Sequence, residues 1–311
     1  MRIFVAGGTG LVGARLIGRL QERQDEVMLL TRRPVTGREQ LGDRGQVVEG
    51  NPMQPGPWMD RVRDCDAVVN LVGENIFSRR WSKQFKDLLV QSRVQSTANV
   101  VKALARSPQT RDGAAKVLVN ASAIGYYGTH SDEALTEASP AGKDFMAQIC
   151  VAWENEARQA QPHGIRVAVI RIGLVLDKAG GALAKLLTPF RLGAGGPIGW
   201  TPWSGSQVIS WIHHEDLVGI ILMALDRPAA TGPINGTAPE PVTNREFGKA
   251  LGRALHRPAF LPTPPLAVRV ILGEVAHVLA TGQRVLPARA QALGYRFRFP
   301  TLDAALADLL A

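Results

Sequence analysis

Four glycines stand close together near the start of the chain, at Gly7, Gly8, Gly10 and Gly13, where they fit both the GxGxxG and the GxxGxxG spacing. They follow a stretch, Arg2 to Ala6, with the pattern of a buried strand, and apolar residues then recur at helical spacing. A strand that turns this tightly into a helix needs glycine, because glycine adopts positive φ cheaply and lets a pyrophosphate approach bare backbone. The helix N-terminus would then offer free N–H groups and partial positive charge to the phosphates. The pattern predicts a dinucleotide site; the alternative is a structural turn with nothing bound.

Two arginines indicate which dinucleotide would bind. Residues 26–31 have the pattern of a second strand, so that Thr31, Arg32 and Arg33 stand at its C-terminal end. In a dinucleotide fold an acidic residue about 20 positions after the glycines binds the 2′-hydroxyl of NAD, whereas arginine there suits the 2′-phosphate of NADP. Because guanidinium pairs well with phosphate, the sequence favours NADP(H). The alternative is that both arginines line a solvated loop.

Length and composition limit the class of protein. A chain of 311 residues can form one large domain or a large and a small one. The two cysteines, Cys65 and Cys150, cannot form a disulfide framework and fit a reducing compartment. The first residues lead straight into the glycine turn, so we expect no signal peptide, and no apolar run approaches a membrane span. We therefore expect a cytoplasmic protein.

The net charge of +9 is spread along the chain, with no run of five basic residues and no interleaved aromatic ladder. This distribution argues against nucleic acid as a partner. A positive field favours anionic small molecules such as a dinucleotide phosphate.

Strand and helix patterns alternate through the first 175 residues, which predicts a doubly wound parallel α/β sheet. We expect further strands at 46–50, 66–73, 116–122 and 166–172, with helices at 82–106 and 145–160.

The pattern changes after residue 180, where we expect a smaller C-terminal lobe. Its helices are predicted at 183–192, 244–255, 266–280 and 302–310. The Gly-rich loop 193–205 carries two tryptophans and is either a lid over a substrate or an ordered surface loop. His213 and His214 are adjacent rather than four residues apart on a helix, so we expect no metal site.

A set of motifs spread over nearly the whole chain resembles one family, the atypical branch of extended short-chain dehydrogenase/reductases called epimerase family proteins. Its members are often described as nucleoside-diphosphate-sugar epimerases or, in some bacteria, as cell-division inhibitors. The motifs are residues 5–13, 66–74, Arg80-Trp81, Ser92-Arg93-Val94 with Ser96-Thr97, Ser122 with 125–128, Trp153-Glu154, 211–213 and 282–287.

The resemblance implies an NADP(H)-binding Rossmann domain over 1–175, with its sheet completed by parts of 205–240, and a substrate-binding lobe over 176–311. It also implies specific roles for individual residues. These are Gly7, Thr9, Gly10, Leu11, Val12 and Gly13 at the pyrophosphate, Thr31 and Arg32 at the adenosine ribose phosphate, Asn51 near the adenine, Leu71 and Gly73 along the ribose, and Ser122 beside the nicotinamide.

The superfamily's usual proton machinery is absent from this sequence. That machinery is a tyrosine acid/base with a lysine four residues later, which lowers the pKa of the phenol. The three tyrosines, Tyr126, Tyr127 and Tyr295, are not followed by lysine at that spacing. Sugar-nucleotide epimerases also place an arginine four residues before the histidine of the motif that contains His213, to bind the diphosphate; here that position is Ile209.

Three functions stay open at the level of sequence. The first is an NADP(H)-dependent oxidoreductase acting on a small carbonyl or sugar-like compound, in which Ser122 binds the substrate oxygen, Tyr127 or Tyr126 is the acid, and Glu74 and Lys143 assist. The second is a non-catalytic NADP(H)-loaded scaffold or sensor that binds a protein partner. The third is an epimerase working through transient oxidation. Extended relatives often dimerise through long helices, and helix 82–106 could serve in a homodimer.

Overall fold

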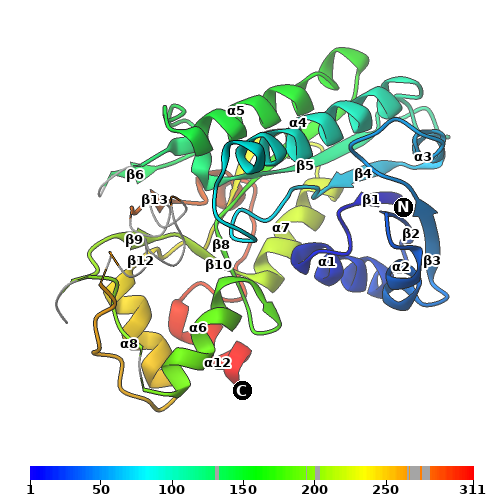
Figure 1. Cartoon of the computed structure of the whole chain (residues 1–311). Coiled ribbons are helices and arrows are strands. Elements are labelled where there is room, and N and C mark those ends of the chain that lie inside the picture. Colours follow the sequence, from blue (N-terminus) through cyan, green and yellow to red (C-terminus); the bar gives the residue numbers. More distant parts are fainter. Residues whose placement is uncertain (130–132, 194, 200–203, 265, 267–273, 275–280) are drawn as a thin grey trace.

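A seven-stranded parallel β-sheet forms the centre of the structure, and helices cover both of its faces (Figure 1). The computed structural model describes residues 1–129, 133–193, 195–199, 204–264, 266, 274 and 281–311. The strand order β11-β7-β5-β4-β1-β2-β3 confirms the predicted doubly wound sheet, since the chain runs outward from β1 in both directions. The strands are β1 (Arg2–Ala6), β2 (Glu26–Thr31), β3 (Gly45–Glu49), β4 (Ala67–Asn70), β5 (Val117–Ala123), β7 (Arg166–Ile172) and β11 (Gly232–Gly236).

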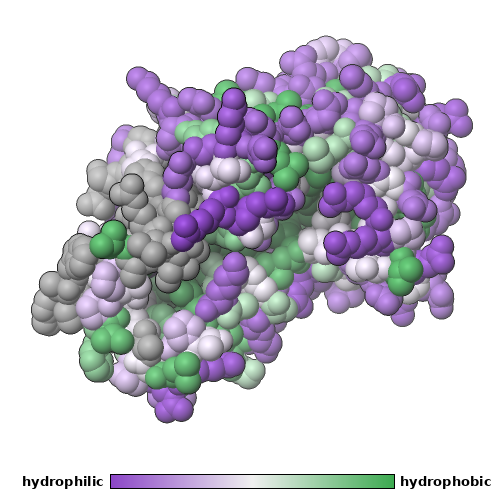
Figure 2. All heavy atoms as spheres, in the orientation of Figure 1, coloured by the Kyte–Doolittle hydropathy of each residue, from purple (hydrophilic) through white to green (hydrophobic). Residues whose placement is uncertain are grey.

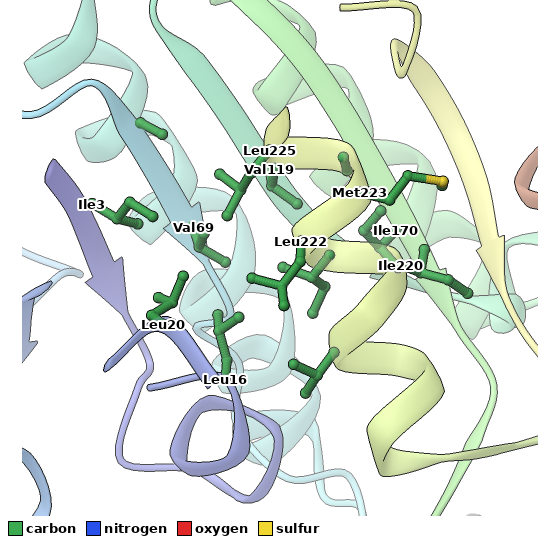
Figure 3. Close-up of a cluster of buried hydrophobic side chains, with 14 of the residues drawn as sticks. Ile3, Leu16, Leu20, Val69, Val119, Ile170, Ile220, Leu222, Met223 and Leu225 are labelled. Carbon is green, nitrogen blue, oxygen red and sulfur yellow. The ribbon is translucent and has the colours of Figure 1, made fainter. Parts of the chain in front are cut away.

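Two helical layers bury the sheet. Helices α1 (Leu11–Glu22) and α7 (His214–Asp226) pack on one face, and α4 (Lys83–Ala105) and α5 (Phe145–Arg158) pack on the other (Figure 1). On the first face, side chains of α1 and α7 point toward those of the central strands (Figure 3). The labelled residues in that view are Ile3, Leu16, Leu20, Val69, Val119, Ile170, Ile220, Leu222, Met223 and Leu225. Burial of each such aliphatic side chain contributes about 1.5–3 kcal/mol, which explains why the central strands are apolar on both faces.

Shorter helices complete the first part of the chain. They are α2 (Pro34–Leu41) and α3 (Trp58–Arg61), followed by the 3₁₀ helices η1 (Val62–Asp64), η2 (Ile124–Tyr127) and η3 (Gln161–His163).

A second hydrophobic cluster organises the C-terminal lobe. It brings together α6 (Gly181–Arg191), α8 (Asn244–Ala254) and α12 (Leu302–Leu310) around the buried Trp211. Among the described residues of this part of the molecule there are three two-stranded sheets, each pairing segments that are separated in sequence. They are β8 (Leu174–Asp177) with β10 (Trp211–His213), β9 (Val208–Ile209) with β12 (Val242–Thr243), and β6 (Ala134–Leu135) with β13 (Arg284–Val285); the short helix α11 (Ala288–Ala292) follows β13.

The structure departs from the predicted elements at several places. The fourth strand ends at Asn70 rather than at residue 73, because the chain leaves the sheet there. Trp211–His213 forms a strand that was not predicted, and α2 was not predicted either. Residues 232–236 supply β11, which pairs with β7 at the edge of the sheet. The predicted helix 266–280 and part of loop 193–205 lie outside the described residues.

Within the described part of the chain, no helix has the length and apolarity required to cross a bilayer.

Candidate cofactor and active site

The glycine turn joins β1 to α1 at the place where the strand order reverses, and open α/β sheets bind ligands there. Gly7 has φ of +80°, and a Cβ on it would lie 2.6 Å from the carbonyl carbon of Leu71. A Cβ on Gly13 would lie 2.5 Å from the Cα of Gly8. At Gly10, by contrast, an added Cβ would meet only the Gly7 oxygen, at 3.4 Å. Close backbone packing therefore requires glycine at Gly7 and Gly13, while Gly10 faces open space.

The N-terminus of α1 is available to an anion. Its N-cap residue is Gly10, which has no side chain to cap the helix, and the first turn contains no acidic residue. The first N–H groups of a helix then lack side-chain acceptors and carry partial positive charge. Thr9 and Gly10 are exposed, and Leu11 and Val12 are half-buried. These residues, together with Gly7 and Gly13, form the turn predicted to bind a pyrophosphate.

Arg32 and Arg33 are both exposed at the carboxyl end of β2, next to the glycine turn. Neither forms an ion pair with any residue in the described ranges, so both guanidinium groups are available to a ligand. The backbone N–H of Arg33 donates to Thr31 Oγ1 at 3.0 Å, which fixes the turn into α2. Gln40 of α2 donates to the carbonyl oxygen of Gly8 at 2.7 Å and ties α2 to the turn.

Buried amides hold the two loops beyond β3 and β4. Asn70 donates to Thr97 Oγ1 at 2.9 Å and to Asn120 Oδ1 at 2.7 Å, which fixes the point where Leu71 and Gly73 leave the sheet. Asn99 of α4 donates to the carbonyl oxygen of Pro52 at 2.9 Å. The amide oxygen of Asn51 accepts from the N–H of Met53 at 3.1 Å, so it is engaged in a local turn.

Ser122, near the end of β5, is hydrogen-bonded to a buried ion pair formed by Glu154 and Arg171. Its hydroxyl donates to Glu154 Oε1 at 2.9 Å, and only 2% of the serine is exposed. Arg171 of β7 donates to both carboxylate oxygens of Glu154, at 2.8 and 2.9 Å. Arg158 donates to Glu154 Oε2 at 2.8 Å. The serine hydrogen is thus committed to a carboxylate, and the oxygen can still accept a hydrogen bond.

The two candidate tyrosines differ in their surroundings. The Tyr127 hydroxyl is fully buried; it donates to Asn235 Oδ1 at 2.7 Å and accepts from Arg171 Nη1 at 3.0 Å. Burial raises the pKa of Tyr127 to about 12. Tyr126 is half-buried, and the Arg171 guanidinium carbon lies 3.4 Å from its ring centroid. Its hydroxyl has no hydrogen-bond partner among the residues that the structure describes. The geometry therefore assigns Tyr127 a place in the buried network and leaves Tyr126 as the candidate acid.

Helix α5 contains neither a tyrosine nor a lysine. Met146, Cys150 and Glu154 follow one another at intervals of four, so they share one face of it. A Cβ on Gly125 would lie 3.3 Å from the Met146 Cβ and 3.8 Å from the Cys150 Sγ, and Glu154 binds Ser122. Burial raises the pKa of the Cys150 thiol to about 12. This face therefore presents an apolar side chain and a protonated thiol to Gly125, and only Glu154 hydrogen-bonds to Ser122.

Glu74 and Lys143, the two residues expected to assist catalysis, form no hydrogen bond with Ser122 or Tyr126. The Glu74 carboxylate accepts from the Ser78 hydroxyl at 3.2 Å, and Lys143 is exposed ahead of α5. The structure instead adds Arg171 and Asn235. Arg171 follows four consecutive apolar residues inside β7, and a charge at such a position was the signal in the sequence that could have identified it.

A hollow separates the sheet domain from the lower lobe on the face shown in Figure 2, with apolar residues at its floor and hydrophilic residues along its rim. A second cavity, of about 640 Å³, lies at the end of α8 and is lined by Lys249, Arg253, His256 and Phe260, among others. It belongs to the C-terminal lobe and does not involve the glycine turn. Across the described residues, no group of three His, Cys, Asp or Glu side chains could bind a metal.

The sequence from residue 3 to 235 matches the model of the NAD dependent epimerase/dehydratase family. The chain belongs to this family. Residues 263–309 match a second family model, a domain of unknown function designated DUF1731. The two matches together include most of the sheet domain and the end of the C-terminal lobe.

Family members from plants and animals are similar over the whole chain. The Arabidopsis thaliana protein "Epimerase family protein SDR39U1 homolog, chloroplastic" is 42% identical over 310 residues, covering 100% of this chain and 87% of that protein. The human epimerase family protein SDR39U1 is 39% identical over 318 residues, covering 100% of both.

Solved structures of family members have the same fold. The crystal structure of the human protein with NADPH superimposes with a TM-score of 0.85 and covers 100% of this chain and 99% of that chain. A nucleoside-diphosphate sugar epimerase from Corynebacterium glutamicum has a TM-score of 0.78 at 32% identity, and the match covers 58% of its chain. The resemblance inferred from the motifs is confirmed.

Proposed function

We propose that this chain binds NADP(H) at the β1–α1 turn, with the pyrophosphate on residues 7–13 and the 2′-phosphate on Thr31, Arg32 and Arg33. The observation that carries the proposal is the uncapped N-terminus of α1, which lies one strand away from two unpaired guanidinium groups. NADPH in the human relative supports the choice of cofactor. Asn51, Leu71 and Gly73 would line the adenine and ribose, and Ser122 would lie beside the nicotinamide.

The test is thermal unfolding with NADPH compared with NADH. A ligand at about 100 times its Kd stabilises the folded state by roughly 2.7 kcal/mol. For a cooperative unit of 150–250 residues this raises Tm by about 5–10 °C. We expect the increase with NADPH to exceed that with NADH clearly. Equal increases in Tm with NADPH and NADH would show that Arg32 and Arg33 do not bind the 2′-phosphate.

We further propose that the bound cofactor serves an oxidoreductase reaction on a small carbonyl or sugar-like substrate, held between the sheet domain, 1–175, and the lobe formed by 176–311. NADP(H) would supply or accept a hydride there. Ser122, with its hydrogen directed at Glu154, accepts a hydrogen bond from substrate or cofactor, and Tyr126 exchanges a proton with the substrate oxygen. The Arg171 guanidinium against the Tyr126 ring stabilises negative charge that develops on that phenol.

A second function is favoured by the α5 face. Because Met146 and Cys150 lie against Gly125 and the Tyr127 hydroxyl is fully buried, the site has little proton-transfer machinery. A non-catalytic NADP(H)-loaded scaffold or sensor that binds a protein partner agrees with this arrangement. Steady oxidation of NADPH with any member of a carbonyl library separates the two functions, since a scaffold shows none.

Diphosphate-sugar epimerisation has weaker support. The position expected to carry the arginine that binds the diphosphate is Ile209, on the short strand β9. We also propose a cytoplasmic location, although one relative is named as chloroplastic, and a homodimer through α4, with no nucleic-acid partner.

A further inference from the structure

Arg93, in the middle of α4, is a half-buried cation without an ion-pair partner among the described residues. Burial lowers its pKa. Its shorter bonds are to backbone carbonyls: Nη1 donates to Leu89 at 3.0 Å and Nη2 donates to Glu74 at 3.0 Å, while Ser92 Oγ lies 3.5 Å from Nη1. Removing a charge from water without a partner is costly, so an unpaired guanidinium in this position calls for an explanation.

The guanidinium lies at the edge of the proposed cofactor site. A Cβ built on Gly73 would lie 3.2 Å from the Arg93 Cζ and 3.5 Å from its Nε, so the arginine fills the space beside the bare backbone of Gly73. Gly73 follows the end of β4, and the end of β5 carries Ser122 on the neighbouring strand. Both positions lie beyond the glycine turn along the same edge of the sheet.

On its other side, Arg93 contacts α5. Its Cζ lies 5.2 Å from the ring centroid of Trp153, a cation–π contact, and Cys150 precedes Trp153 by three residues on the same helix. Cys150 belongs to the α5 face on which a lysine is missing. Arg93 therefore brings a cation from α4 against α5, which has no lysine of its own.

The guanidinium is held firmly and still has donors to offer. The Glu74 N–H donates to Ser92 Oγ at 3.1 Å while the Glu74 carbonyl accepts from Arg93, so neighbouring residues of α4 bind both backbone groups of one residue. The Nε–H of Arg93 has no partner within the described residues, and it is not among the fully buried polar atoms that lack one. A fixed guanidinium with an accessible N–H is well suited to bind an oxygen ligand.

We propose that Arg93 is a cofactor-binding residue for the nicotinamide half of NADP(H). The Nε–H of Arg93, beside Gly73, donates a hydrogen bond to an oxygen atom of that half. This inference rests on the proposed function. In this proposal Arg93 takes over the cationic role of the absent lysine. Loss of Arg93 should therefore weaken binding of the nicotinamide half of the dinucleotide and not of the adenosine half.

The experiment measures the Kd of wild-type protein, Arg93→Met and Arg93→Lys for NADPH and for 2′,5′-ADP, which contains only the adenosine half. We expect Arg93→Met to weaken NADPH binding about ten- to a hundredfold, the usual effect of losing a hydrogen bond from a charged donor, and to leave 2′,5′-ADP binding unchanged. Arg93→Lys should lie between the two. Arg93→Gln, which can still donate to Glu74, replaces Arg93→Met if that variant does not fold.

Arg166→Met provides a matched control. Arg166 is also an arginine whose pKa burial lowers and whose donors bind backbone carbonyls, here those of Ala224, Leu225 and Ala230, but it begins β7 at the opposite edge of the sheet. Its loss should lower stability and leave both Kd values unchanged.

Three results would overturn the proposal. Unchanged NADPH binding in Arg93→Met would show that the arginine does not touch the cofactor. An equal loss of NADPH and 2′,5′-ADP binding would show that it only holds loop 71–74 in place. Absence of binding of either ligand by the wild-type protein would overturn the proposed function as well.

Discussion

Ser122 donates a hydrogen bond to Glu154 Oε1, and the Glu154 carboxylate is in turn bound by the guanidinium of Arg171. All three side chains are at most 2% exposed. The candidate active-site serine on β5 is thus oriented by a buried ion pair between Glu154 of α5 and Arg171 of β7. Because removing one partner of such a pair leaves an uncompensated buried charge, the arrangement makes the site dependent on Glu154.

Glu154→Gln should lower the free energy of unfolding by about 3–5 kcal/mol, because Arg171 then loses its buried counter-ion. Urea denaturation measures the change. Asp303→Asn is the control: Asp303 pairs with Arg253 at 2.8 Å, but both side chains are more than 60% exposed. Its substitution should cost less than about 1 kcal/mol. Similar values for the two variants would mean that the buried pair contributes no more than a surface pair.

Two glycines of α1 should respond to alanine with opposite signs. Gly13→Ala places a Cβ 2.5 Å from the Cα of Gly8, and overpacking of this kind costs about 1–3 kcal/mol. Gly18→Ala meets nothing within 4 Å, so the better helix propensity of alanine should stabilise the protein by about 0.5–1 kcal/mol. Thermal unfolding of both variants checks the prediction, which fails if Gly13→Ala is as stable as the wild type.

Arg32→Ala should raise the Kd for NADPH about ten- to a hundredfold and leave the Kd for NADH unchanged, because only NADPH carries the 2′-phosphate. Arg38→Ala serves as the control, since Arg38 is exposed on α2, a helix turn beyond the predicted phosphate site. Fluorescence titration of the reduced nicotinamide measures both constants. Equal weakening of NADPH and NADH would point to a general loss of structure instead.

Tyr126→Phe and Tyr127→Phe should separate catalysis from stability. If a carbonyl substrate is found, Tyr126→Phe should lower kcat about 10²- to 10⁴-fold, the usual contribution of a general acid. Tyr127→Phe removes a hydroxyl that bonds to Asn235 and Arg171, so it should cost about 1–3 kcal/mol of stability. A large loss of kcat in Tyr127→Phe, with stability intact, would reverse the two roles.

His213 should make the protein less stable in mild acid. Its Nδ1 accepts from the N–H of Glu215, and burial lowers the pKa of the imidazole although Asp308 Oδ2 lies 3.3 Å from Nε2. The unfolded chain binds a proton below about pH 6.5, whereas the folded protein resists it. The contribution of His213 is therefore complete above that pH and is lost as the pH falls.

Urea denaturation between pH 7.5 and 4.5 measures this effect. Below about pH 6.5 the free energy of unfolding of the wild type should fall more steeply than that of His213→Gln, by up to about 1.4 kcal/mol per pH unit. Parallel curves for the two proteins would rule out a neutral buried His213.

The sequence alone determined the doubly wound sheet, the glycine turn and the position of Arg32. These features depend on neighbouring residues: apolar periodicity sets the strands and helices, and a strand-to-helix turn needs glycine wherever it occurs. The same local reading predicted β1 and β2 with their observed bounds. It also showed that the tyrosine–lysine pair is missing.

Only the tertiary structure decided what surrounds Ser122. Glu154, Arg171 and Asn235 come from α5, β7 and β11, and no local spacing indicates that they meet. Tyr126 and Tyr127 are adjacent in the chain, but the side chains packed around them leave one half-buried and seal the other. Arg93 reaches Gly73 because α4 packs across the end of β4. Burial and charge pairing depend on residues distant in sequence, so they emerge only when the chain is folded.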